Sequence, residues 1–440
     1  MESMYTIVET VLPASWIESV TTADPKAIAM SLLVIVGFAF TAIPPLVPLM
    51  KWTLSMGRLK FVLWRHNNKN GSSNDTYNAA SVSGMYIHPL KSGRSRVVYE
   101  TELDEKRGTL MDDRRFMVVF QLPPPSSSSR SSKQSTATHR FLTQRECPSL
   151  ARVQAKIVTK VVRRVDTETE LLLDYTSSDG ATKSIRVLLS STSNTVEGTT
   201  SHETQQQPQR QRLLAQIWDD IVAVDDLGDE AATFFQDIVD EDEVKSGGGD
   251  DTKLVRIVQA STTPPLAPIP KDYRKYVPSY CKTPQGLYLG KPTLTDGFPI
   301  LIASEASLEY LNQQLVANGR DEIPMSRFRP NIVIRGKNLK PFEEDKWKIV
   351  KIGSVYFAIV KACPRCKQSC TDQTTGIVDK HMEPLKTMST FRKSKENKDK
   401  KAGSVFFAQN AFPIGDYQGK TIKLGDPIQI VERGDLVFID

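Results

Sequence analysis

The sequence is poor in cysteine, in hydrophobic residues and in net charge, and each shortage argues against a class of protein. Five cysteines in 440 residues argue against a disulfide framework and for a reducing compartment. The net charge of +6 is small for this length, and no basic stripe alternates with aromatic residues, so nucleic-acid binding is not expected. A hydrophobic content of 39% indicates long polar insertions in a chain with room for one large or two ordinary domains.

Signatures of a built-in electron carrier are also missing. The sequence contains no C-x-x-C-H haem motif and no convincing dinucleotide-binding or flavin fingerprint. Any redox chemistry would therefore draw its electrons from a separate protein. Two polar stretches, 123–137 and 190–211, are rich in Ser, Thr, Pro or Gln and are expected to be disordered or flexible insertions.

One stretch lacks charge altogether. Residues 27–50 contain no charged side chain, and roughly 20 apolar residues suffice to cross a bilayer core. A transmembrane helix is therefore predicted, with a buried core helix as the alternative. Acidic residues dominate the tail 1–26, whereas the segment after residue 50 is basic, so the positive-inside rule places the body in the cytosol. Residues 51–80 would then be a basic juxtamembrane linker.

Three of the five cysteines lie close together, as Cys363-x-x-Cys366-x-x-x-Cys370, after a strand-like segment at 350–360. A structural zinc site is one interpretation, but it needs a fourth ligand from Cys147, Cys281 or His381. A thioredoxin-like redox pair is disfavoured because no convincing helix follows the motif. The third interpretation is a single thiolate that ligates a metal held mainly by a cofactor.

Cations and hydroxyl groups fall at the ends of predicted strands. Lys91 and Ser92 follow the strand-like segment 81–88, and Arg114 precedes another at 115–121. Such groups can bind a phosphate, although surface cations are more often simply solvated.

Two later segments add similar chemistry. Ser304 ends an apolar strand and is predicted to cap a helix, whose N-terminus could hold an anion or could be capped and nothing more. A further strand at 327–334 carries two arginines and an asparagine at its entry.

Together these segments resemble the MOSC-domain family, and in particular its membrane-anchored enzymes that reduce amidoximes. The resemblance runs from about residue 81 to residue 431 and rests on seven motifs in order: YIHPLKSG, MDDRRFMVV, FLTQRECPSLARV, LIASEASLEYLN, FRPNIVIRG, CPRCKQSCTDQTTG and TIKLGDPIQI. It implies an α+β, mainly β fold. An N-terminal MOSC-type β domain at 81–245 would precede a MOSC β-barrel at 252–440, with one transmembrane helix before both.

The resemblance also implies a molybdenum–pterin cofactor. Cys366 would be the catalytic residue and the metal ligand, since a soft thiolate suits a metal that changes oxidation state. Where relatives place a tyrosine near the pocket, this chain has Asn410 or Phe412. The implied cofactor-binding residues are Lys91, Ser92, Arg114, Ser304, Glu305, Ser307, Arg329, Asn331, Arg365 and Asn410.

By the same resemblance, the protein would reduce small N-hydroxylated compounds such as amidoximes and hydroxylamines. Its electrons would come from cytochrome b5 and NADH-cytochrome b5 reductase, and it would lie in the outer mitochondrial membrane or the endoplasmic reticulum. One alternative is a MOSC protein that carries or sulfurates the cofactor, although the family's pyridoxal phosphate-binding sulfurase domain is not expected here. A membrane-tethered zinc scaffold is the other alternative.

Overall fold

The computed structural model describes residues 46–69, 78–105, 107–123, 137–163, 166–197, 200–218, 220–246, 254–260, 278, 294–393 and 404–434. The predicted tail, most of the predicted membrane span and nearly all of the insertion at 123–137 lie outside these residues. Within the described part of the chain, no helix combines the length and the apolar character needed to cross a membrane.

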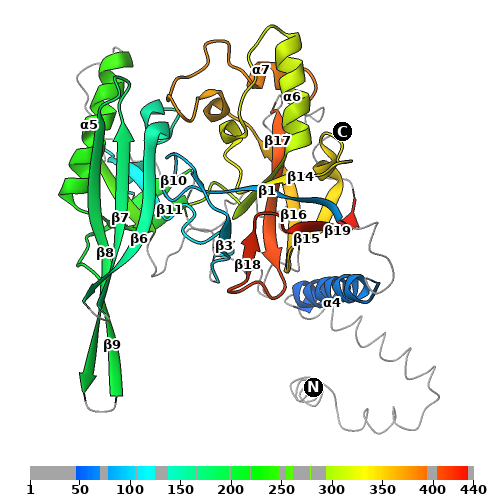
Figure 1. Cartoon of the computed structure of the whole chain (residues 1–440), viewed down its shortest axis with the longest axis horizontal. Helices are drawn as coiled ribbons and strands as arrows, with labels where there is room; N and C mark the ends of the chain where they lie inside the picture. Colours follow the sequence, from blue (N-terminus) through cyan, green and yellow to red (C-terminus); the bar gives the residue numbers. More distant parts are fainter. Residues whose placement is uncertain are drawn as a thin grey trace.

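The first described element is helix α4 (Leu46–Lys69). It begins inside the predicted span and continues through the first part of the segment expected to be a linker. Leu59 on this helix is buried against Phe298 and Phe412 of the C-terminal domain. The basic segment after residue 50 is thus a helix that packs on the body of the protein (Figure 1).

The C-terminal domain is built on a sheet that closes on itself. Strand β1 pairs with β14 on one side and β19 on the other, so the order β14-β13-β17-β16-β15-β19-β1 forms a ring, with β2 added to β1. The strands are β1 (Asn78–Ile87), β2 (Arg96–Val97), β13 (Ile300–Ser304), β14 (Ile332–Arg335), β15 (Trp347–Ile352), β16 (Val355–Pro364), β17 (Phe406–Ile414) and β19 (Pro427–Arg433).

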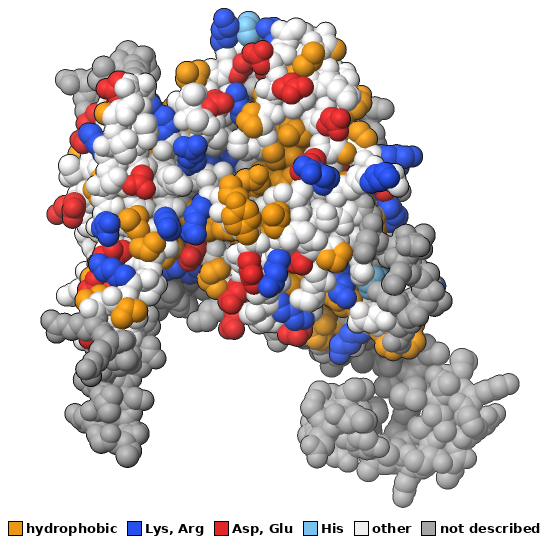
Figure 2. Space-filling model, in the orientation of Figure 1, with side chains coloured by type: hydrophobic (Ala, Val, Ile, Leu, Met, Phe, Trp, Pro, Cys, Tyr) orange, Lys and Arg blue, Asp and Glu red, His pale blue; other side chains and the backbone are white. Residues whose placement is uncertain are grey.

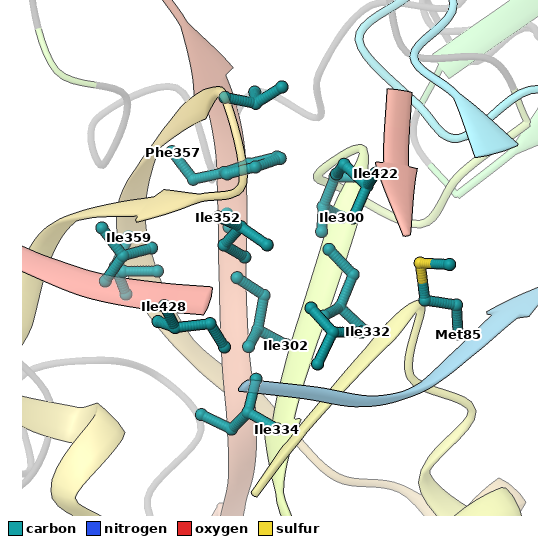
Figure 3. Close-up of a cluster of buried hydrophobic side chains, with 14 of the residues drawn as sticks. Met85, Ile300, Ile302, Ile332, Ile334, Ile352, Phe357, Ile359, Ile422 and Ile428 are labelled. Carbon is teal, nitrogen blue, oxygen red and sulfur yellow. The ribbon is translucent and has the colours of Figure 1, made fainter. Parts of the chain in front are cut away.

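Branched aliphatic side chains fill the interior of this ring. Ile302, Ile334 and Ile352 come from three different strands and point toward one another (Figure 3). Alternation along each strand sends every second side chain to this interior. The two-stranded sheet of β3 (Glu100–Glu102) and β18 (Thr421–Lys423) adds Ile422 to the same cluster.

The N-terminal domain contains a second closed barrel, of β4 (Phe116–Gln121), β5 (His139–Phe141), β10 (Arg212–Ile217), β11 (Asp220–Asp226) and β12 (Val255–Ala260). Beside it lies a four-stranded antiparallel sheet of β6 (Val153–Arg163), β7 (Asp166–Thr176), β8 (Thr182–Glu197) and β9 (Thr200–Gln206). Helix α5 (Asp229–Ser246) buries Phe235 and Ile238 in the core shared with this sheet. The prediction of a mainly β fold is confirmed.

One local prediction differs from the structure. The stretch 190–211 was expected to be a flexible insertion, but β8 and β9 pair there in a long hairpin. Threonine favours strands, and this hairpin contains several.

Two helices lie at one end of the C-terminal domain. Helix α6 (Glu305–Ala317) follows β13, and it lies with α7 (Leu385–Met388) at the opposite end of this domain from α4 (Figure 1). The remaining elements are the 3-10 helices η1 (Pro148–Arg152), η4 (Met325–Phe328), η5 (Glu343–Lys346) and η6 (Lys367–Cys370).

Candidate functional site

The first part of the site is the turn that follows β1. Lys91 is only 4% exposed, yet its ammonium group donates to Leu294 O at 2.9 Å and pairs with Asp296. Burial is the main cause that lowers the pKa of Lys91. Ser92 adopts a left-handed backbone conformation with φ 69°, which is unfavourable for any residue with a Cβ.

A second cation approaches this turn from the chain before β4. The guanidinium of Arg114 pairs with Asp113 and lies 3.4 Å from Asn331 Oδ1. Asp113 is fully buried, which alone would raise its pKa, but Arg114 and hydrogen bonds from His88 bring that pKa down to about 2. Asp113 is therefore ionised at neutral pH and fixes Arg114 in place. Arg114 also has a left-handed backbone, with φ 48°.

The third cation, Arg329, ends the 3-10 helix η4 and joins the two domains. It is 7% exposed and left-handed, with φ 53°. Its guanidinium donates to Gly93 O, and to Gln373 Oε1 at 2.9 Å. Burial, followed by repulsion from Arg114, lowers the pKa of Arg329 to about 9. Because this pKa is still well above 7, Arg329 keeps its charge at neutral pH.

The cysteine loop lies against the same groups. Strand β16 ends at Pro364, and Cys366 occupies the exposed position just before η6. The Cys366 carbonyl accepts a hydrogen bond from Ser369 Oγ at 2.8 Å. The guanidinium of Arg365 donates to Phe328 O at 2.9 Å and lies 3.1 Å from Cys363 Sγ. The strand thus delivers one accessible thiol beside Arg365.

The other cysteines of the motif are placed differently. Cys370 is fully buried, and its burial raises the pKa of its thiol to about 11. Cys147 is buried in the N-terminal core, and Cys281 lies outside the described residues. Among the residues that the structure describes, no group of three or more His, Cys, Asp or Glu side chains converges as in a metal site. These residues therefore give the zinc interpretation no set of ligands.

Ser304 ends β13, Asn331 directly precedes β14, and Asn410 lies on β17. Ser304 precedes α6 as predicted, but its side chain makes no capping hydrogen bond, and its buried Oγ has no partner among the described residues. Asn331 accepts from Leu301 N at 3.1 Å and donates to Tyr86 O at 3.3 Å. Asn410 pairs with Leu301 from the other side.

Two predicted residues point elsewhere. Ser307 is fully buried, and its hydroxyl donates to Glu344 Oε1 at 2.6 Å and accepts from Phe342 N at 2.8 Å. Glu305 pairs with Arg335 and lines a separate cavity of about 450 Å³ between β1 and α6. The structure brings Lys91, Ser92, Arg114, Arg329, Asn331 and Arg365 together, but gives Ser307 and Glu305 other contacts.

The site also contains residues that were not predicted. Gln144 and Gln373 exchange hydrogen bonds at 3.0 and 3.1 Å, and Gln144 also donates to Ser92 O at 3.1 Å. Asp113 and Asp296 provide the carboxylates that face the cations. Gln144, Gln373 and Asp113 all lie within the motifs that carry the family resemblance, and that position was the only signal for them in the sequence.

The chemistry of this cluster fits an anionic, polar ligand. Lys91, Arg114, Arg329 and Arg365 repel one another electrostatically, with Asp113 and Asp296 as the opposing charges. Buried cations are stable when they are paired, and a phosphate would relieve this repulsion. The buried Arg365 Nε of this cluster has no hydrogen-bond partner among the described residues. A pterin with a terminal phosphate offers both the charge and the polar edges that these groups require.

Comparison with known families agrees with this architecture. The family described as "MOSC N-terminal beta barrel domain" matches residues 79–242, and the family described as "MOSC domain" matches residues 290–429. The chain is therefore a MOSC-domain protein, and the predicted resemblance is confirmed.

Among curated proteins, the chain is similar to amidoxime reducing components. It is 36% identical over 135 residues to "Mitochondrial amidoxime reducing component 2" of Bos taurus, which covers 30% of this chain and 37% of that protein. Identity to "Mitochondrial amidoxime-reducing component 1" of Homo sapiens is 37% over 138 residues, or 31% and 38% of the two chains. The chain thus spans less than half the length of these relatives. Their names refer to the reduction of amidoximes.

A relative of another kind is also similar. "Molybdenum cofactor sulfurase" of Arabidopsis thaliana is 40% identical over 101 residues, which is 22% of this chain and 12% of that protein. Amidoxime reducing components and a molybdenum cofactor sulfurase are therefore each similar to a part of this chain.

Proposed function

We propose that this MOSC protein binds a molybdenum–pterin cofactor and reduces N-hydroxylated compounds such as amidoximes and hydroxylamines. The observation that carries the proposal is the accessible thiol of Cys366, which a strand end holds beside a buried cluster of cations. The names of the curated relatives point to the same chemistry. The names of these relatives include a mitochondrial location, and the proposal extends that location to this protein.

The cation cluster would hold the phosphate end of the cofactor. Lys91 and Arg329 are both almost fully buried, so their charges act in a medium of low polarity, where they attract an anion more strongly than in water. Arg114 and Arg329 offer planar guanidinium groups that can bind a phosphate through two parallel hydrogen bonds. Ser92 adds a hydroxyl group at the same turn.

Cys366 would ligate the metal, and the groups near it would orient the cofactor and substrate. When bound, the cofactor would supply the electrons that reduce the N–O bond. Ser369 fixes the Cys366 carbonyl and hence the backbone that carries the thiol. Ser304 and Asn331 are proposed to make polar contacts with the pterin. Asn410 would stand at the edge of the pocket, where it can affect the choice of substrate.

Electrons are proposed to come from cytochrome b5 and its NADH-dependent reductase, because the sequence has no haem or flavin signature of its own. A second candidate is a protein that carries or sulfurates the cofactor. It is favoured by the similarity to molybdenum cofactor sulfurase over 101 residues. Both candidate functions would use the same cofactor site, so a measurement of turnover has to distinguish between them.

The test compares Cys366→Ala with Cys370→Ser in the full chain. Molybdenum content by mass spectrometry and reduction of benzamidoxime with a reconstituted cytochrome b5 chain are measured for both. Cys366→Ala is expected to abolish turnover and weaken cofactor retention, whereas Cys370→Ser keeps its molybdenum because its thiol is buried away from solvent. Equal metal loss in both variants would refute the ligand assignment. A fully loaded wild-type protein without turnover would refute the reductase and favour the carrier.

A further inference from the structure

Helix α4 has apolar side chains on two opposite faces. One face packs on the C-terminal barrel through Leu59, with Val62 and Leu63 beside it. The other face carries Leu54, Phe61 and Trp64, whose exposed fractions are 68%, 58% and 60%. Their spacing of seven and three residues puts them on one side of the helix, and the Phe61 and Trp64 rings stack at 6.0 Å.

The helix is fixed to the barrel by polar contacts as well as by its buried face. Arg58 forms an ion pair with Glu432 on β19. The Tyr356 hydroxyl donates to Asn67 Oδ1 at 2.7 Å and lies 3.3 Å from His66 Nδ1. The exposed face of α4 therefore has a set orientation relative to the whole domain.

The charged residues of the helix itself all have the same sign. Helix α4 contains no Asp or Glu, and its charged residues are Lys51, Arg58, Lys60, Arg65 and Lys69. By helical periodicity, Lys60 lies on one edge of the exposed apolar strip and Arg65 on the other. Figure 2 shows hydrophobic and basic side chains together at the lower right of the described surface, where Figure 1 places α4.

This arrangement fits a lipid surface better than a protein partner. Tryptophan and phenylalanine between flanking lysines and arginines are typical of helices that lie at a membrane interface, and anionic headgroups attract the basic edges. Protein interfaces, by contrast, are depleted of lysine at their core.

We propose that α4 lies flat in the headgroup region of an anionic phospholipid bilayer, with Leu54, Phe61 and Trp64 toward the acyl chains. The contact sets the orientation of the C-terminal domain relative to the membrane, because α4 cannot tilt without breaking its contacts with the barrel. The end of the domain that carries α6 and α7 then faces the water, since it lies opposite α4 (Figure 1). The inference does not depend on which reaction the site performs.

The test uses the full chain reconstituted in vesicles of phosphatidylcholine and phosphatidylserine, with and without lipids brominated next to the headgroup. The emission of Trp64 is obtained by subtracting the spectrum of a Trp64→Phe variant. The bromolipids are expected to quench this component, and the vesicles are expected to shield it several-fold from iodide. Trp218, which is 42% exposed on the N-terminal domain, serves as the matched control through Trp218→Phe and should show neither effect.

A second variant, Phe61→Glu, adds a charge to the exposed face without touching the buried one, and it should reduce the quenching of Trp64 several-fold. The proposal is overturned if Trp64 is equally open to iodide with and without vesicles. It is also overturned if Trp64 is shielded in the absence of lipid, which would indicate a protein contact. Molybdenum content, measured on the same samples, reports the proposed function separately.

Discussion

Replacement of Arg329 by Met gives the sharpest test of the proposed anion site, because it should separate the effect on stability from the effect on binding. The pKa of Arg329 falls from its ordinary value to about 9, a difference of roughly 3 to 4, and each unit corresponds to ~1.4 kcal/mol. The folded site therefore disfavours this charge by about 5 kcal/mol. Since the pKa of a base is lowered, this cost is fully present below pH 9 and is relieved only as the pH rises above it.

The substitution also removes favourable contacts. Gly93 O loses its donor, at a cost of about 1–3 kcal/mol, whereas Gln373 Oε1 keeps its hydrogen bond from Gln144. The left-handed backbone costs Met about as much as Arg, because both side chains carry a Cβ. We therefore expect the cofactor-free Arg329→Met protein to be more stable than the wild type, by about 2 kcal/mol at pH 7.5.

Urea unfolding of cofactor-free protein, with and without inorganic phosphate, measures both effects. Phosphate should stabilise the wild type, by ~2.7 kcal/mol at a hundredfold excess over its dissociation constant, and should leave Arg329→Met unchanged. Arg335→Met is the matched control, because Arg335 is exposed and pairs with Glu305 outside the cluster. A variant that is less stable than the wild type, yet still stabilised by phosphate, would refute the reasoning.

Two further predictions concern packing and pH. Gly93→Ala should destabilise the protein by about 1–3 kcal/mol in thermal unfolding, since a Cβ there would lie 2.9 Å from two side-chain carbons of Leu90; unchanged stability would mean that the turn can move. Glu344 is fully buried, and burial together with Asp345 raises its pKa to about 7. Stability should therefore fall as the pH rises from about 4.5 to 7, by ~3 kcal/mol. Glu344→Gln should flatten this part of the profile, and an unaltered slope would exclude Glu344 as its source.

The strands and the motif chemistry could be predicted from the sequence to a large extent. The run before Cys363 reads as a strand because aromatic and β-branched residues cluster there, and β15 and β16 occupy it. The hairpin of β8 and β9 was missed because its polar composition resembles that of a flexible insertion. Pairing between strands stabilises such a segment, and composition alone does not reveal the partner strand.

The site was harder to predict where it depends on contacts between distant segments. Ser307 belongs to a family motif, but its hydroxyl contacts Glu344, which lies 37 residues further along the chain. Gln144 and Gln373 are 229 residues apart in sequence and meet only because both domains close around Arg329. A motif can identify the residue types of a site, whereas the direction of each side chain depends on the packing of the elements around it.

Several unfavourable features meet at the cation cluster, and together they argue for an anionic ligand there. Ser92, Arg114 and Arg329 all have left-handed backbones, which cost about 1–3 kcal/mol each. Arg114 and Arg329 are also two of the like charges that repel one another there, and the buried Arg365 Nε has no hydrogen-bond partner among the described residues. A polyanion would relieve the charge repulsion and would offer acceptor oxygens to the guanidinium groups. Since the strain is already present in the protein alone, binding would need little rearrangement of the backbone.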